Sequence, residues 1–475
     1  MVEWVRPPMQ NAIDLQSYFQ NQMEAAAGDF SGLFRLDAGS DFLDFAGLLE
    51  NYVAILALIP LLISLYAFFA GHPANARNGE SSTSTTTKFL YQNNKQNSRA
   101  VQLIKEVGDY VPPSWYNKHV GALVALGNDP KLVYQRQVLF ESKNELVCVD
   151  WYPRQPPPLS SGEDVRVVIA FPGLGLKSTS KFFQKFVITI GENDSRMYCA
   201  VLLTRGVGCP LKSAKGLWNP GMANDGERLI KHIHDLWQGK ASIFLAGFSA
   251  GTNITKLILK SERRALAPVQ GAFCVASNNA DYLHSRHCLE SSWGGRIYSR
   301  LITSIYKDII FSNPQIHAEI GLDKVRRLKS VTLLSDYDAY AYSYLYAAYS
   351  TEDEYYRALS PSHEGYKCPF LLLQPQDDPL HRARSAEAKS AEELIAKNDK
   401  CIYMSTAAGN HFGFYEGHIT EALTSAKTYT YPARVARVFF DSISSEPQKE
   451  EERGPTKQPK HICTKNKLKF ALNIN

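Results

Sequence analysis

The feature that most constrains the fold is a serine between two glycines, placed where an apolar run meets a helix-permissive segment. Residues 241–247 are mostly apolar and suit a buried strand, whereas residues 252–261 favour a helix. Between them residues 247–251 read GFSAG, the pattern of a tight strand-to-helix turn called the nucleophile elbow. Such a turn strains the serine backbone and leaves no room for side chains at the glycines. The Ser249 hydroxyl would then project above the sheet, near the N-terminus of the helix.

Strand-like and helix-like segments alternate along most of the remaining chain. The strand candidates are residues 132–139, 146–152, 165–171, 198–204, 242–246, 269–276, 369–374 and 400–405. The helix candidates are residues 179–191, 221–238, 252–260, 386–397 and 428–442. This alternation predicts an α/β fold with a mostly parallel sheet and helices on both faces. The first two strand candidates are close enough to form an antiparallel hairpin leading into that sheet.

One long segment, residues 277–366, interrupts this alternation between the sixth and seventh strand candidates. It contains a tyrosine-rich run, and before it four apolar residues at helical spacing, Ile297, Leu301, Ile305 and Ile309. Ligands of such sheets bind beyond the carboxyl ends of the strands, where this insertion would lie. We interpret the insertion as a helical lid and the first three of these residues as candidate substrate contacts. The alternative, that they simply pack on the core, stays open.

A serine hydroxyl becomes a nucleophile only when a histidine removes its proton and a carboxylate orients that histidine. In this fold the acid and then the histidine follow the serine along the chain. The strand candidate at 369–374 is followed by Asp377 and Asp378, and the one at 400–405 is followed by His411 in a glycine-containing loop. Order and spacing therefore predict His411 as the general base, with one of the two aspartates behind it.

Asp378 is the better candidate of the two aspartates. Pro379 follows it and biases its backbone toward an extended conformation, which helps hold the carboxylate toward the histidine. Asp377 is then expected to be structural, capping the loop.

An oxyanion hole is predicted from FPGLG at residues 171–175, which follows the strand candidate 165–171. The backbone N–H of Leu174 would join that of Ala250 in stabilising a tetrahedral oxyanion. Chemistry of this kind needs no metal and no organic cofactor.

Near the N-terminus, residues 53–70 read VAILALIPLLISLYAFFA, without a charged side chain. This approaches the roughly 20 residues that a helix needs to span a bilayer. A cleaved signal peptide is a poor fit, because the run starts too far along the chain and lacks a basic flank before it. We predict one transmembrane helix, with a buried globular helix as the alternative.

The side of the membrane is predicted from the basic residues that follow the span, Arg77, Lys88 and Lys95. Because basic residues favour the cytosolic side, the region after the span is expected in the cytosol. The eight cysteines form no CxxC pair and fall mostly in apolar runs, which agrees with a reducing compartment. The organelle is left open, with the endoplasmic reticulum favoured.

These features divide the chain into an N-terminal region 1–52, the span 53–70, a linker 71–98, a folded region 99–444 and a tail 445–475. The linker is polar and rich in serine and threonine, so we expect it to be disordered or loosely tethered. The lysine-rich tail could touch an anionic membrane, but a solvated tail is the better interpretation.

The sequence argues against a nucleic-acid partner and against a metal site. The net charge of +5 is small for 475 residues, and the basic residues form no face interleaved with aromatic residues, so no nucleic-acid partner is expected. The run KHIHD at 231–235 faintly resembles a metal site, but residues two apart on a helix point to different faces. No metal is therefore predicted.

Seven short motifs together indicate a family. They are YVPPSW at 110–115 with His119, Asp150-Trp151, FPGLGLKS at 171–178, TRGVGCPL at 204–211, GFSAGTNI at 247–254, LLQPQDDPL at 372–380 and GNHFGFYEG at 409–417. In this order they resemble the membrane-anchored α/β-hydrolase domain-containing proteins 1, 2 and 3 and the related yeast medium-chain fatty-acid ethyl-ester synthase/esterases, the AB hydrolase 4 family. The resemblance spans about residues 110–442 and implies an α/β-hydrolase fold.

The resemblance also implies lipid ester substrates: acylglycerols, phospholipids or medium-chain fatty-acyl esters. Two departures from the family pattern lie beside the predicted site. The chain has Gly-Thr-Asn at 251–253 where the family commonly has Gly-Gly-Asn, and Gly-Asn-His at 409–411 where it commonly has Gly-Gly-His. Neither removes a catalytic group, but both alter the walls of the site.

The sequence therefore predicts a single-pass membrane serine hydrolase, with Ser249 as nucleophile, His411 as base and Asp378 as the orienting acid. The same acyl-enzyme would serve an acyltransferase that uses an alcohol in place of water, and the sequence does not separate the two. A catalytically silent scaffold or receptor of the same fold is the third alternative, and the presence of all three groups argues against it. No oligomeric state is predicted.

Overall fold

The computed structural model describes residues 87–113, 116, 132–155, 165–191, 194, 196–261, 269–277, 282–345, 349–360, 364–381, 384–416 and 431–444. All of them belong to one compact unit, Asn75–Asn475. No helix within these ranges is long and apolar enough to cross a bilayer. The predicted span 53–70, the region before it and the tail 445–475 lie outside the described residues.

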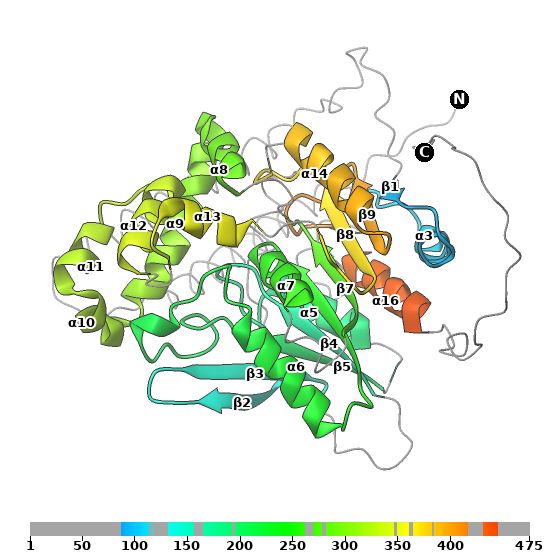
Figure 1. The fold of residues 1–475 in the computed structure, drawn as a ribbon, viewed down its shortest axis with the longest axis horizontal. Helices are drawn as coiled ribbons and strands as arrows, with labels where there is room; N and C mark the ends of the chain where they lie inside the picture. The colour runs from blue at the N-terminus through cyan, green and yellow to red at the C-terminus, as the bar shows by residue number, and fades with distance from the viewer. Residues whose placement is uncertain are drawn as a thin grey trace, which may run out of the picture. The chain divides into compact units, whose positions relative to one another are not determined.

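The unit is built on a nine-stranded sheet with strand order β1-β9-β8-β7-β6-β4-β5-β3-β2 (Figure 1). The strands are β1 Lys88–Tyr91, β2 Gln135–Glu141, β3 Leu146–Tyr152, β4 Arg166–Phe171, β5 Met197–Leu202, β6 Ser242–Phe248, β7 Val269–Val275, β8 Phe370–Pro375 and β9 Cys401–Thr406. The six strands from β5 to β9 in this order are parallel, and the strands at both edges of the sheet pair antiparallel. The predicted α/β-hydrolase fold class is confirmed, as is the hairpin of β2 and β3.

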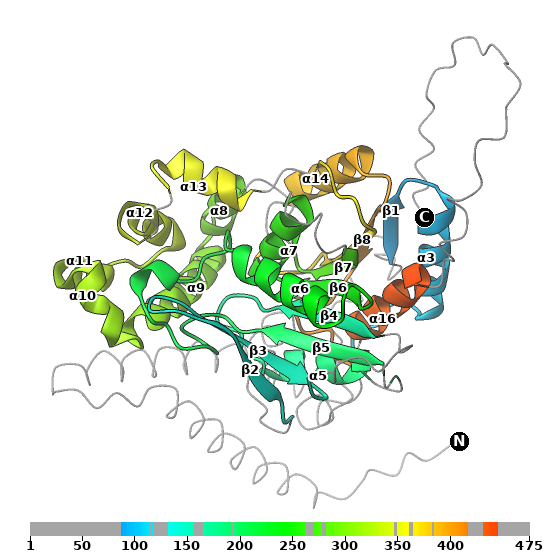
Figure 2. The ribbon, with the colours of Figure 1, turned by 60° about the horizontal axis from the view of Figure 1, so that its bottom comes forward.

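Helices cover both faces of the sheet, which is why its central strands are apolar throughout. The flanking helices are α3 Lys95–Glu106, α5 Lys181–Gly191, α6 Asn224–Leu236, α7 Ala250–Lys260, α14 Arg384–Lys397 and α16 Tyr431–Ser444 (Figure 2). In β4, Val167 and Ile169 pack in a core with α6 and α7, whereas Val168 and Ala170 pack in a second core with α3, α5 and α16. Successive side chains of a strand point to opposite faces, so a strand covered on both sides is apolar at every position.

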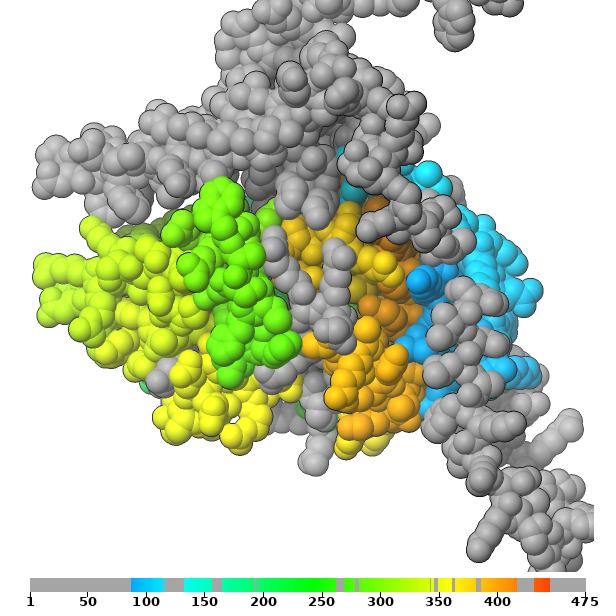
Figure 3. Space-filling model, turned by 90° about the horizontal axis from the view of Figure 1, so that it is seen from above, coloured from blue at the N-terminus to red at the C-terminus, as the bar shows by residue number. Residues whose placement is uncertain are grey.

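The predicted insertion between β7 and β8 is helical. It contains α8 Tyr282–Glu290, α9 Trp293–Phe311, α10 His317–Ile320, α11 Leu322–Leu328, α12 Leu334–Tyr344 and α13 Glu352–Leu359. On the face shown in Figure 3, the green to yellow atoms of these helices fill the left and lower part, and the orange atoms of α14 lie to their right. Helix α9 is the longest of them and begins at Ser292, whose side chain accepts a hydrogen bond from the Gly295 N–H at 3.1 Å.

The predicted linker 71–98 is wrong at its C-terminal end, because β1 and the start of α3 lie within it. β1 pairs with β9 from Lys88↔Ser405 to Tyr91↔Ile402. The polar side chains that suggested a loose linker have defined partners here: Gln92 Nε2 donates to Ile395 O at 2.7 Å, and Asn94 Nδ2 donates to Asp399 O at 2.6 Å. The segment therefore docks through these hydrogen bonds and through Phe89, Leu90 and Tyr91, which pack partly buried against the two cores.

Candidate active site

Ser249 lies in a strained turn between β6 and α7. Its backbone has φ 51° and ψ −120°, outside the regions that residues with a Cβ prefer. A Cβ on Gly251 would overlap the carbonyl oxygen of Phe171, and one on Gly247 would lie 2.5 Å from Thr255 Oγ1. The backbone prediction for this elbow, including the need for both glycines, is confirmed.

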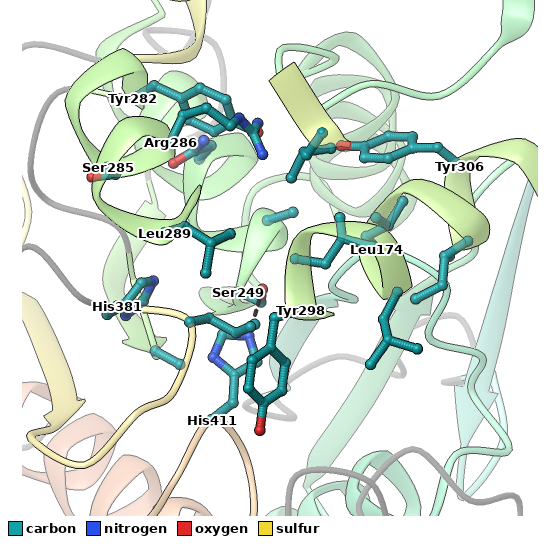
Figure 4. A pocket seen from close by; sticks show the side chains of 18 of the residues that line it. Leu174, Ser249, Tyr282, Ser285, Arg286, Leu289, Tyr298, Tyr306, His381 and His411 are labelled. Carbon is teal, nitrogen blue, oxygen red and sulfur yellow. Dashed lines mark hydrogen bonds between the residues drawn. The ribbon is translucent and has the colours of Figure 1, made fainter. Parts of the chain in front are cut away.

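His411 and Asp378 reach Ser249 from the ends of two other parallel strands. Asp378 follows β8 and His411 follows β9, so their loops meet the elbow at the same edge of the sheet. His411 Nε2 is 2.8 Å from Ser249 Oγ, and His411 Nδ1 is 2.7 Å from Asp378 Oδ2. The structure thus brings the three predicted triad residues into one hydrogen-bonded chain. Figure 4 shows its Ser249–His411 hydrogen bond as a dashed line.

Asp378 is anionic in this setting. Its side chain is fully buried, and burial alone would raise its pKa. The His411 and His381 imidazoles and the Leu380 N–H, which donates to Oδ1 at 2.9 Å, outweigh burial and lower the Asp378 pKa to about 2. A carboxylate of this kind orients His411 and favours the imidazolium form.

Asp377 has a different set of partners. Its Oδ2 accepts from the Tyr116 hydroxyl at 2.5 Å, and its Oδ1 accepts from the Asn410 N–H at 2.8 Å. Tyr116 in turn accepts from the Gly409 N–H at 3.0 Å. The structure therefore places Asp377 as a brace for the loop that carries His411, and burial raises the pKa of its carboxyl.

An apolar pocket opens beside the Ser249 hydroxyl. Leu174 and Ala250, the predicted oxyanion-hole residues, line it together with Ser249 and His411 (Figure 4). Leu174 follows Gly173, where a Cβ would lie 3.0 Å from the Ser249 Cβ, so the 171–175 loop runs directly against the elbow. The Ala250 N–H is in the first turn of α7, where a helix has no internal acceptor for it.

Helix α9 forms one wall of this pocket, with a face that overlaps the predicted one in part. The lining residues on α9 are Tyr298, Leu301, Ile302, Ile305 and Tyr306. Leu301 and Ile305 were predicted, whereas Ile297 does not line the pocket. Ile309 is buried in the core, where a Cβ on Gly206 would meet its Cγ2. The residues of α9 that line the pocket lie further around the helix than the predicted ones. Hydrophobic spacing alone does not fix which edge of a broad apolar face meets the cavity.

Three features of the pocket were missed at the sequence level. Arg286 lines the pocket while buried, and it pairs with Asp338 at 2.7 Å. His381 lies next to Asp378, three residues further along the chain. Tyr116 braces the His411 loop from a segment far away in sequence. Only His381 had a sequence signal, its position just after the DDPL of the acid motif.

The described cysteines are free thiols, and all except Cys288 are buried. Within the described ranges no three His, Cys, Asp or Glu side chains gather in a way that could hold a metal ion.

No family model matches the chain. It is 22% identical over 343 residues to mouse phospholipase ABHD3, covering 70% of this chain and 78% of the relative. It is 26% identical over 267 residues to the Danio rerio monoacylglycerol lipase ABHD2, covering 54% and 60%, and 22% identical over 306 residues to the monoacylglycerol lipase of Saccharomyces cerevisiae, covering 62% and 64%. These relatives form an ABHD-like group of α/β hydrolases. The predicted family resemblance is confirmed.

The alignments span less than two thirds of the zebrafish and yeast relatives. Among solved structures, an esterase from Pyrobaculum calidifontis is 13% identical with a TM-score of 0.38, covering 74% of this chain and 92% of its own. A Rhizomucor miehei esterase is 12% identical with a TM-score of 0.39, covering 72% and 97%. At these scores the fold assignment rests on the strand order described above.

Proposed function

We propose that the chain is a serine hydrolase that cleaves carboxylic esters of lipids through an acyl-enzyme. The observation that carries the proposal is the hydrogen-bonded chain from Ser249 Oγ through His411 to Asp378, with distances of 2.8 and 2.7 Å. These are the distances at which a base can take a hydroxyl proton and be oriented by an acid.

In the proposed reaction Ser249 Oγ attacks the ester carbonyl while His411 Nε2 takes its proton. The negative charge that forms on the carbonyl oxygen is stabilised by the N–H groups of Leu174 and Ala250. His411 then gives its proton to the leaving alcohol oxygen as the C–O bond breaks. Water resolves the acyl-enzyme by the same steps, with His411 again as base. Asp378 stays ionised throughout.

The apolar lining supports a lipid substrate. Leucine, isoleucine and aromatic side chains surround the serine, and an acyl chain is stabilised in such a pocket by roughly 0.8 kcal/mol for each buried CH₂. Three relatives carry names that include phospholipase or monoacylglycerol lipase, which supports the same class of ester. We further propose that residues 53–70 anchor the enzyme in a membrane. Such an anchor would hold the active site close to lipid esters of that membrane.

A fluorophosphonate probe tests the acyl-enzyme directly, because it forms a covalent bond with an activated serine. We expect the purified 475-residue chain to be labelled, and Ser249→Ala to abolish both labelling and hydrolysis of a monoacylglycerol. Ser330→Ala, an exposed serine on the insertion, is the matched control and should label normally. A folded wild-type chain that is not labelled, or a Ser249→Ala variant that keeps a tenth of the activity, would contradict the proposal.

A further inference from the structure

A second imidazole lies against the carboxylate that holds His411. His381 Nδ1 is 3.3 Å from Asp378 Oδ2, the same oxygen that lies 2.7 Å from His411 Nδ1. The two rings meet edge to face with centroids 5.7 Å apart, and both line the pocket at Ser249, His411 against the serine and His381 further to the side (Figure 4). The His381 side chain is only 13% exposed. A serine–histidine–aspartate mechanism uses one imidazole, so the second is unexplained by the proposed reaction.

Gln374 gives His381 an alternative partner. Its Nε2 is 2.7 Å from His381 Nδ1, whereas its Oε1 is buried without a partner among the described residues. A neutral His381 with its proton on Nε2 accepts the amide N–H at Nδ1, and Asp378 then serves His411 alone. A protonated His381 cannot accept that bond. Its Nδ1–H then faces Asp378 Oδ2. If the Gln374 side-chain amide flips by 180°, its Oε1 can accept a hydrogen bond from the same Nδ1–H.

We propose that His381 is a positioning residue that acts on the reaction through Asp378. In its neutral form, held by Gln374, it leaves the carboxylate to His411; in its protonated form it binds the same carboxylate oxygen and slows attack by Ser249. This inference rests on the proposed serine-hydrolase function.

Other charged groups face His381 from both of its sides. Of the described residues, His381 alone lines both the active-site pocket and a second cavity between β1 and α14. The other ionisable side chains that line the active-site pocket are Tyr282, Arg286, Tyr298, Tyr306 and His411, and those that line the second cavity are Lys88, Glu387, Glu392 and Tyr403. Asp378, at 3.3 Å, is the charged side chain in direct contact with His381 among the described residues.

Protonation of His381 has a defined kinetic consequence. As Ser249 attacks, His411 becomes an imidazolium, and a second positive ring 5.7 Å away repels it. At the screening typical of protein sites this slows the reaction about 10-fold or more. In the profile of kcat/KM against pH, two protonations then lower the rate as the pH falls, one on His411 and one on His381. The slope of log kcat/KM against pH should therefore rise above 1 across the pH range in which His381 protonates and return to 1 at still lower pH.

The test is the acid limb of His381→Asn, because asparagine keeps a polar group near the position of Nδ1 but carries no charge. We would measure kcat/KM of the full 475-residue chain in detergent on a short soluble ester, from about pH 4.5 to about pH 9, by titrating the acid released. The rate of fluorophosphonate labelling at each pH gives a second readout. We expect the stretch of slope above 1 to disappear, and the ratio of kcat/KM near pH 5 to kcat/KM on the plateau to rise about 10-fold over that of the wild type. His287→Asn, an exposed histidine of α8, should keep the wild-type profile.

A purely structural role would lower the plateau or the melting temperature and leave the slope unchanged, and that result would overturn the inference. Gln374→Met provides a second variant, since it removes the donor that favours neutral His381. Its acid limb should move to higher pH, and an unmoved limb would also count against the inference. Failure of the proposed function looks different: no activity or labelling dependent on Ser249 would be found at any pH.

Discussion

Two adjacent aspartates in one loop have different roles because their carboxylates face different neighbours. Asp378 points at His411, and Asp377 holds the loop that carries His411 through Tyr116 and the Asn410 N–H. The turn that follows β8 separates the two carboxylates, so only Asp378 reaches the imidazole.

Substituting each aspartate separates orientation from bracing. Asp378→Asn should keep the fold but leave His411 in the wrong tautomer, with kcat reduced by up to about 10⁴. Asp377→Asn should lower kcat far less and lower the melting temperature, because it weakens the brace. Both variants would be assayed at matched folded concentration, with thermal melts alongside. The reverse order of activities would move the acid to Asp377.

Lys256 on α7 supports a prediction about stability and pH. It is 1% exposed, and burial lowers its pKa from 10.5 to about 8. Below pH 8 it is protonated in both states, so the cost of burying the charge is fully present. Between about pH 8 and 10.5 the unfolded chain binds more protons, so this residue's contribution to stability improves as pH rises.

Lys256→Met should therefore raise the free energy of unfolding at pH 7 by about 1–3 kcal/mol, an advantage that shrinks between about pH 8 and 10.5. Urea unfolding at a series of pH values measures it. Lys260→Met, on the same helix but only half-buried, should show little effect at any pH. A constant advantage for Lys256→Met across the series would mean that packing, rather than charge burial, is responsible.

The triad residues could be predicted from sequence because each follows a strand and their order along the chain is fixed by the fold. Tyr116 could not, since the motif YVPPSW that precedes it gives no sign that its hydroxyl contacts Asp377, 261 residues further along the chain. Nor could the Arg286–Asp338 pair, because a buried ion pair looks in sequence like two surface charges.

At the scale of elements, α9 determines the shape of the pocket. Leu301 and Ile305 line it, and α9 lies so close to the 171–175 loop that a Cβ on Gly175 would be 2.7 Å from Ile305 Cγ2. Gly175 also has a φ of 72°, which disfavours any other residue. This wall therefore has little room for larger side chains.

Leu301→Asp should reduce hydrolysis of long-chain esters much more than hydrolysis of an acetate, because a charge in the lining disfavours an acyl chain. The matched control is Ile297→Asp, which places the same charge one turn away on α9 outside the lining. The ratio of kcat/KM for the two esters is the quantity to compare. Equal losses on both esters for Leu301→Asp would indicate unfolding and remove α9 from the substrate site.

All eight predicted strands correspond to strands of the sheet, with shifts of a few residues at their ends, because central strands covered on both faces are apolar and short. β1 was missed since four residues in a polar surrounding give no periodic signal. Its pairing depends on the exposed edge of β9, which exists only in the folded molecule. Tertiary contacts of this kind override local composition.

At the scale of the whole molecule, β1 sets where the catalytic unit begins. A chain starting at Asn75 keeps β1 and α3, whereas one starting at Ser98 loses β1 and the first turn of α3. We expect the shorter chain to melt several degrees lower and to aggregate more readily, because the edge of β9 is uncovered. Equal melting temperatures would show that β1 contributes nothing to the fold.

The chain starting at Asn75 also tests the proposed anchor. The 475-residue chain should resist extraction from membranes by alkaline carbonate, whereas the truncated chain should be released. Release of both would contradict a spanning helix at 53–70. Retention of both would instead implicate a surface of the catalytic unit.

The pairing of the first strand with the last strand has a consequence for synthesis in the cell. β1 leaves the ribosome early, but its partner β9 follows about 300 residues later. At the usual 5–20 residues per second, β1 waits roughly 15 to 60 seconds before it can pair. The loops bearing Asp378 and His411 adjoin the last two strands made, so the nascent chain carries its nucleophile long before it can use it.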